Sequence, residues 1–163
     1  MKKLLMLPIF AALFSLTGCG GVDVIDYNDK LVELAETCFT AENLMWDAVD
    51  QENYTLANEL LSSSIETCQK TQTDTAAMEG YNDDTDLRDA VDALLQAEVA
   101  YLTKFQEALP YRELDEMSDE ENANYEAIEA ELDILDEASV AASNNLVSIQ
   151  EAFSTKHGYE LEE

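Results

Sequence analysis

Basic residues are scarce in this sequence. Its 163 residues contain 8 Lys and Arg against 36 Asp and Glu, which gives a formal net charge of −28 at pH 7. Proteins bind nucleic acids largely through Lys and Arg side chains that neutralise phosphates. Because a chain this acidic is repelled by a polyanion, we expect no nucleic-acid partner.

Proline, glycine and histidine are also rare. Two Pro and five Gly, beside 47% apolar residues, argue against a disordered or collagen-like chain. The one histidine, His157, cannot supply the two Glu-x-x-His motifs of a di-iron bundle. It also forms no close ligand pair with Cys38 or Cys68 of the kind that structural zinc needs. We therefore expect no enzyme activity and no cofactor.

The only long apolar run lies at the N-terminus, and it is short for a membrane span. Lys2 and Lys3 precede an apolar segment of 13 residues, 4–16. A helix needs about 20 apolar residues to cross a bilayer. A basic start followed by a shorter apolar run is typical of an export signal. Residues 1–18 are therefore predicted to be a signal peptide.

The motif that ends this segment is Leu16-Thr17-Gly18-Cys19. It resembles the lipobox of bacterial lipoproteins. The resemblance implies that Cys19 receives diacylglycerol, becomes the first residue of the mature chain and is N-acylated. Two or three acyl chains hold a protein stably on a membrane, so the mature chain would be anchored without spanning it. Gly20 stands where enterobacterial lipoproteins retained at the inner membrane have Asp, which favours an outer membrane if the cell has one.

Residues 19–24 are predicted to be the acylated cysteine and a spacer, and residues 25–163 a single helical domain. Apolar residues recur there at alternating spacings of three and four, the period of one face of an α-helix. The first stripe consists of Tyr27, Leu31, Leu34, Cys38, Ala41, Met45 and Ala48. Polar residues 50–53 then form a turn, and a second helix is predicted from Tyr54 to Ala77.

Two further helices are predicted in the second half. The third begins at a cap provided by Asp84 or Thr85 and ends at Pro110, because proline lacks the amide donor. The fourth opens with the capping box Ser118 to Glu121, keeps its apolar stripe to Phe153 and ends at Lys156 and His157, where Gly158 can close it. At this length it must either bend near residues 143–145 or project from the bundle. With no competing strand pattern, the fold class is all-α, an antiparallel up-down-up-down four-helix bundle with a long fourth helix.

Cys38 and Cys68 lie on the inner stripes of the first two helices, at similar distances from the intervening turn. They could therefore face each other and form a disulfide in an oxidising envelope. Two buried free thiols acting as small apolar residues are the alternative.

Oxygen-bearing side chains gather in one predicted loop, at Asn82, Asp83, Asp84, Asp86 and Asp89. Calcium takes several oxygen ligands from a single loop, so a divalent-cation site using Asn82, Asp84, Asp86 and Asp89 is one hypothesis. The run lacks the glycine and the glutamate that an EF-hand has at positions six and twelve. Helix capping and the helix dipole account for the same residues, and we favour that interpretation.

The predicted mature part is similar to a group of uncharacterised helical bacterial surface lipoproteins. The similarity rests on residues 27–29, 53–54, 153–158 and 161–162, which lie at the ends of predicted helices. It implies a helical architecture and no particular activity. We therefore expect an envelope lipoprotein that acts as a structural or interaction module, with a basic protein or cationic peptide as the preferred partner. The alternative is a divalent-cation-binding envelope protein.

Overall fold

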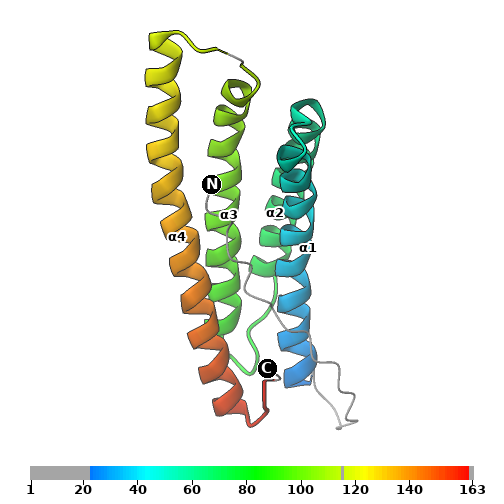
Figure 1. Cartoon of the computed structure of the whole chain (residues 1–163). Helices are drawn as coiled ribbons and strands as arrows, with labels where there is room; N and C mark the ends of the chain where they lie inside the picture. The colour runs from blue at the N-terminus through cyan, green and yellow to red at the C-terminus, as the bar shows by residue number, and fades with distance from the viewer. Residues whose placement is uncertain (1–22, 115, 162–163) are drawn as a thin grey trace.

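The computed structural model describes residues 23–114 and 116–161, which form four α-helices joined by short connections (Figure 1). The helices are α1 (Val24–Asp50), α2 (Tyr54–Ala76), α3 (Asp86–Arg112) and α4 (Asp119–His157). Consecutive helices run in opposite directions and pack against each other. The chain is therefore an antiparallel up-down-up-down four-helix bundle, which confirms the predicted fold class.

Side-chain caps fix where three of the helices begin. The Asp23 side chain accepts a hydrogen bond from the amide two residues on, at 3.0 Å, and Asn53 accepts one from the amide three residues on, at 3.2 Å. Ser118 and Glu121 form the predicted capping box. Each cap satisfies an amide that has no partner within its helix. The cap at Asp23 starts α1 at Val24, inside the segment that we predicted to be spacer.

Asp84 and Thr85, the two predicted capping residues, both take part at the start of α3. Thr85 occupies the cap position, but its hydroxyl donates to the Asp89 carboxylate at 2.8 Å and accepts no backbone hydrogen bond. Asp84 supplies the capping oxygen, which accepts from the Asp86 amide at 3.2 Å.

The end of α3 differs from the prediction. We predicted that Pro110 ends the helix, whereas α3 continues to Arg112. A proline in the final turn removes one hydrogen bond and leaves the few remaining residues free to stay helical. The prediction is wrong by two residues because proline blocks bonding to the preceding turn and does not by itself stop the chain that follows.

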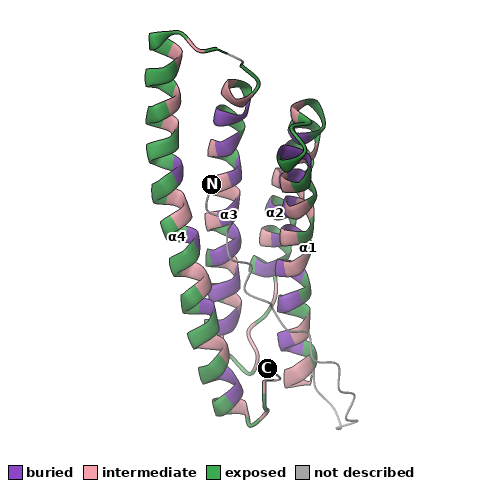
Figure 2. Ribbon diagram, in the orientation of Figure 1, coloured by how far each residue is buried: buried purple, intermediate pink, exposed green. Residues whose placement is uncertain are grey.

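Helix α4 is continuous over 39 residues, about 58 Å at 1.5 Å per residue. Leu132 is its first buried residue, so the turns before it are covered only in part. Figure 1 shows these turns standing beyond the end of the α1–α2 hairpin, and Figure 2 shows that they are mostly exposed. Of the two predicted outcomes, projection is the one found, and the N-terminal end of α4 is the end that projects.

The core lies between the helices and is formed by apolar side chains from all four. Phe105, Leu95 and Leu102 of α3 are fully buried, as are Met45 of α1 and Leu61 of α2. Helix α3 packs against both α2 and α4, and α1 packs mainly against α2. Helix α4 contributes only five buried residues against ten from α3, so it is the most weakly covered helix of the bundle.

The bundle has two ends that differ in what they contain. The proximal end holds the start of α1, the α2–α3 connection at residues 77–85 and the end of α4. The distal end holds the α1–α2 connection at residues 51–53 and the α3–α4 connection at residues 113–118. Among the described helices, none has a stretch that is both long enough and apolar enough to cross a membrane.

Candidate functional site

Cys19, the predicted lipid-attachment residue, lies outside the described residues. What the structure shows is the position of the helix that follows it. Residues 20–23 separate Cys19 from Val24, the first residue of α1. A chain of this length spans at most about 18 Å. Any anchor at Cys19 would therefore be attached to the proximal end of the bundle.

Asp84 is the centre of a polar cluster at this proximal end. Its Oδ2 lies 2.6 Å from Lys156 Nζ and 3.2 Å from His157 Nε2, while its side chain is only 6% exposed. The hydrogen bond from Lys156, with help from His157 and the Asp86 amide, lowers the pKa of the Asp84 carboxyl to about 2. The cluster fastens the end of α4 to the α2–α3 connection.

The predicted calcium ligands do not come together as one site. Asp89 pairs with Arg88 at 2.6 Å, and the hydrogen bonds from Arg88 and Thr85 lower the pKa of its carboxyl. Asn82 and the following residue have positive φ angles and form the turn before α3. Within the described residues, no three His, Cys, Asp or Glu side chains are grouped so that they could hold a metal ion. Asp84 and Asp89 instead pair with the cationic side chains of Lys156 and Arg88.

An open hollow of about 530 Å³ lies beside this turn. Its walls combine the rings of Tyr27 and Tyr81 with Met78 and charged residues, among them Asp26 and Lys30. Tyr27 and Tyr81 also pack against Phe153, which joins α1, the turn and α4 in one aromatic cluster. The hollow is broad and open to solvent.

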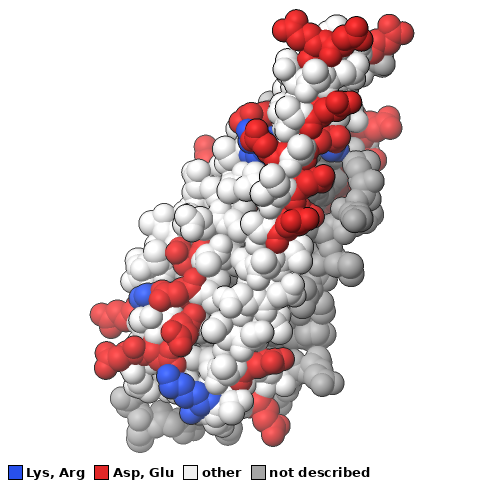
Figure 3. Space-filling view, turned by 90° about the vertical axis from the view of Figure 1, so that its left-hand side faces the viewer, with Lys and Arg blue, Asp and Glu red and all other residues white. Residues whose placement is uncertain are grey.

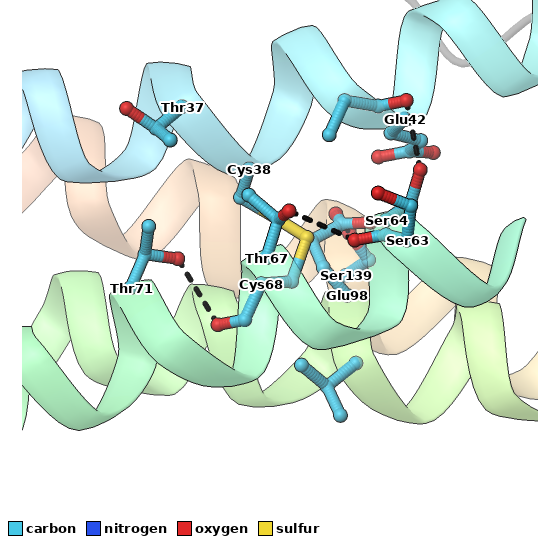
Figure 4. Close-up of a disulfide and its surroundings, with 12 residues drawn as sticks. Thr37, Cys38, Glu42, Ser63, Ser64, Thr67, Cys68, Thr71, Glu98 and Ser139 are labelled. Carbon is cyan, nitrogen blue, oxygen red and sulfur yellow. Dashed lines mark hydrogen bonds between the residues drawn. A yellow bond between two sulfur atoms is a disulfide. The ribbon is translucent and has the colours of Figure 1, made fainter. Parts of the chain in front are cut away.

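Cys38 and Cys68 form a disulfide between α1 and α2, with their Cα atoms 4.6 Å apart (Figure 4). Both residues are fully buried. Nearby, the Ser64 hydroxyl of α2 bonds to the Ala41 carbonyl oxygen of α1 at 2.8 Å. Of the two alternatives that the sequence left open, the structure therefore contains the bridge, and it ties α1 and α2 together at mid-height.

Two glutamates are buried in the same region. Glu42 of α1 is 4% exposed and Glu98 of α3 is 1% exposed, and both lie in the surroundings of the disulfide in Figure 4. Glu42 Oε1 accepts a hydrogen bond from Trp46 Nε1 at 2.9 Å, and Glu98 Oε1 accepts one from the Ser139 hydroxyl of α4. Glu98 Oε2 is buried without a hydrogen-bond partner at normal distance.

Among the described residues, no basic side chain is one of the groups that shift the pKa of either carboxyl. Burial raises the pKa of Glu42. Burial, followed by the negative charge of Glu42, raises the pKa of Glu98 to about 8. Two carboxyl groups that interact this closely titrate as a pair, and placing two charges in a low-dielectric core is costly. A pKa of about 8 favours the protonated form of the Glu98 carboxyl at neutral pH.

We did not identify this pair from the sequence, although a signal was present. Glu42 lies four residues after Cys38 and three before Met45, on the inner stripe of α1. Glu98 falls between Leu94 and Leu102, at spacings of four, on the inner stripe of α3. An acid within an apolar stripe indicates a buried carboxyl. Because the chain has 36 acids, most of which are expected on the surface, such an acid is easily mistaken for a surface residue.

The surface itself is dominated by acids. Figure 3 shows acidic side chains over the face that α4 presents and at the distal end, with few basic ones between them. At the distal end the exposed acids include Glu113, Glu116, Asp119 and Glu120 around the α3–α4 connection. Arg112, at the end of α3, lies 3.8 Å from Glu129 of α4. The distal end therefore presents a high density of negative charge.

Comparison of the chain with family models, with curated proteins and with solved structures found no match.

Proposed function

We propose that this protein is a lipid-anchored protein of the bacterial cell envelope, on the outer membrane where one exists. In this proposal its acidic bundle is a structural or interaction module held on the membrane by acyl chains on Cys19. The observation that carries the proposal is the sequence Leu16-Thr17-Gly18-Cys19 directly after a basic and apolar N-terminal segment.

Two features of the bundle support this proposal. The buried disulfide between Cys38 and Cys68 is of a kind that forms and persists in oxidising compartments outside the cytosol. The short distance from Cys19 to the start of α1 would hold the proximal end at the membrane. At 1.5 Å per residue, the 27 residues of α3 would then carry the distal end about 40 Å away from it.

The anchor is tested by changing Cys19→Ala in cells that make the protein. We expect the wild-type chain to be shortened and to enter the detergent phase of Triton X-114. The variant should keep its full length, because processing follows lipid transfer to the cysteine in the lipoproteins that this motif resembles.

The double variant Cys38→Ala, Cys68→Ala is the matched control, since it removes thiols but leaves the anchor motif intact. It should still be shortened and enter the detergent phase. Processing and partitioning of the Cys19→Ala chain that equal those of the wild type would contradict the proposal.

The second part of the proposal concerns the partner. The distal end is strongly negative and faces away from the proposed anchor, so a basic protein or a cationic peptide is the partner that its charge fits. We expect a lysine-rich peptide to bind more tightly at 50 mM than at 300 mM NaCl, because salt screens attraction between exposed charges.

The triple variant Glu113→Gln, Glu116→Gln, Glu120→Gln should weaken this binding by several-fold in isothermal titration calorimetry. Its control carries three similar changes elsewhere on the exposed surface, at Glu59, Glu66 and Glu151. If the two triple variants lose affinity equally, attraction comes from net charge alone and the distal end is not the interaction surface.

A further inference from the structure

We propose that Glu42 and Glu98 form one proton-binding site in the core, and that loss of its proton opens the bundle between α1 and α4. The inference is independent of the lipid anchor and of any partner. It assigns a regulatory role to two residues that packing alone does not explain.

The two glutamates lie where the two helical hairpins of the bundle meet. Glu42 comes from α1 and Glu98 from α3, which are diagonal neighbours in the bundle, and Ser139 brings in α4. The site therefore joins both helical hairpins across the core. Glu98 Oε2, which is buried and has no partner at normal hydrogen-bond distance, is the oxygen left for the proton. A protonated carboxyl can share that proton with Glu42, whereas two carboxylates repel each other.

The groups around the site reinforce this repulsion. Beside Glu42 from α1, the negative charge of Asp136 on α4 also acts on Glu98. Within α3, the negative charges of Asp136, Glu42 and Glu98 also raise the pKa of Tyr101. Arg112 is the cation that lowers it. Helix α2 contributes Ser64 and the bridged Cys68 to this region, and neither carries a charge. On the described elements, the hydrogen bonds from Ser139 and Trp46 favour the ionised carboxyls, but no cation is among the groups that shift the pKa of either one.

The edge between α1 and α4 is where the bundle can open. Its described polar link is the hydrogen bond from Gln150 to Asn28, at 2.8 Å, and its aromatic contact joins Tyr27 and Phe153. Both lie at the proximal end, about 21 Å along α1 from Glu42. By contrast, the disulfide holds α1 to α2 at mid-height. Water can thus reach the pair from the edge between α1 and α4, while the disulfide keeps α1 on α2.

The direction of the pH effect follows because the closed bundle holds the proton more tightly than the open one. The pKa of Glu98 is about 8 in the closed bundle, against 4.5 for an ordinary glutamate. Closure is therefore strongest below pH 4.5 and weakens as the pH rises to about 8. Over that interval opening should become about tenfold more favourable per pH unit, and above it the effect levels off.

Hydrogen exchange of the full chain in detergent tests this inference. The protection of amides in residues 132–153 of α4 is compared with that of the Glu98→Gln variant at the same pH. The base catalysis of amide exchange is equal in the two chains and therefore cancels in the ratio. Between pH 6 and 8, we expect the ratio of wild-type to variant protection to fall by up to about tenfold per unit and then to become constant.

Two further variants make the test decisive. Glu42→Gln should abolish the pH dependence as Glu98→Gln does, and it replaces that variant should it fail to fold. Glu137→Gln is the control, because it removes the same charge from the exposed surface of α4. A ratio that stays constant from pH 6 to 9, or a Glu137→Gln chain that behaves like Glu98→Gln, would overturn the inference.

Discussion

Removing the bridge between Cys38 and Cys68 is expected to lower the free energy of unfolding by about 3.6 kcal/mol. The two cysteines are 30 residues apart, and linking them restricts the unfolded chain more than the folded one. For a domain of this size the melting temperature should fall by about 10 °C on reduction. Urea unfolding with and without reductant measures the change directly.

The double variant Cys38→Ala, Cys68→Ala separates this effect from other actions of the reductant. It should unfold near the midpoint of the reduced wild-type chain, and reductant should not move it further. A wild-type chain with the same urea midpoint in both conditions would show that the bridge contributes nothing to stability.

Replacing Phe105 with alanine is expected to cost about 3 to 5 kcal/mol. The side chain is fully buried, and its ring lies 4.6 Å from that of Trp46 and stacks on Tyr101. The Arg112 guanidinium also lies over the Phe105 ring, 5.1 Å from the ring centre. The variant therefore leaves a cavity where α1 and α3 meet and also loses ring contacts.

The comparison for Phe105→Ala is Leu44→Ala, which removes a large apolar side chain that is 54% exposed. That change should alter the free energy of unfolding by less than about 0.5 kcal/mol. Chemical unfolding followed by Trp46 fluorescence can report on both variants. A cost below about 1 kcal/mol for Phe105→Ala would mean that this junction is not part of the cooperative core.

The helices were predictable because their signals are local. Alternating spacings of three and four residues, the capping box at Ser118 and the polar break at residues 50–53 each act within one or two helical turns. Pro110 shows the limit of such signals. A proline excludes one backbone hydrogen bond, but whether the last turn persists depends on the residues packed around it.

The candidate sites were predictable only in part, because they depend on residues far apart in the chain. Asp84 suggested a cation ligand or a cap from its neighbours in the sequence. In the structure it does cap α3, but it also binds Lys156, 72 residues away. Glu42 and Glu98 each break an apolar stripe, yet no local pattern tells that these two acids meet.

The sequence alone determined the four helices, their order and the acidic surface, and it contains the lipobox-like motif on which the proposed anchor rests. Each of these follows from residue types and short spacings, which do not depend on how the helices are arranged. The tertiary structure decided which residues meet: the cysteine bridge, the contact of Asp84 with the end of α4, and the buried carboxyl groups of Glu42 and Glu98. Those meetings depend on how far each helix is rotated and shifted along its neighbour, and many small packing contacts across the core set that rotation and shift together.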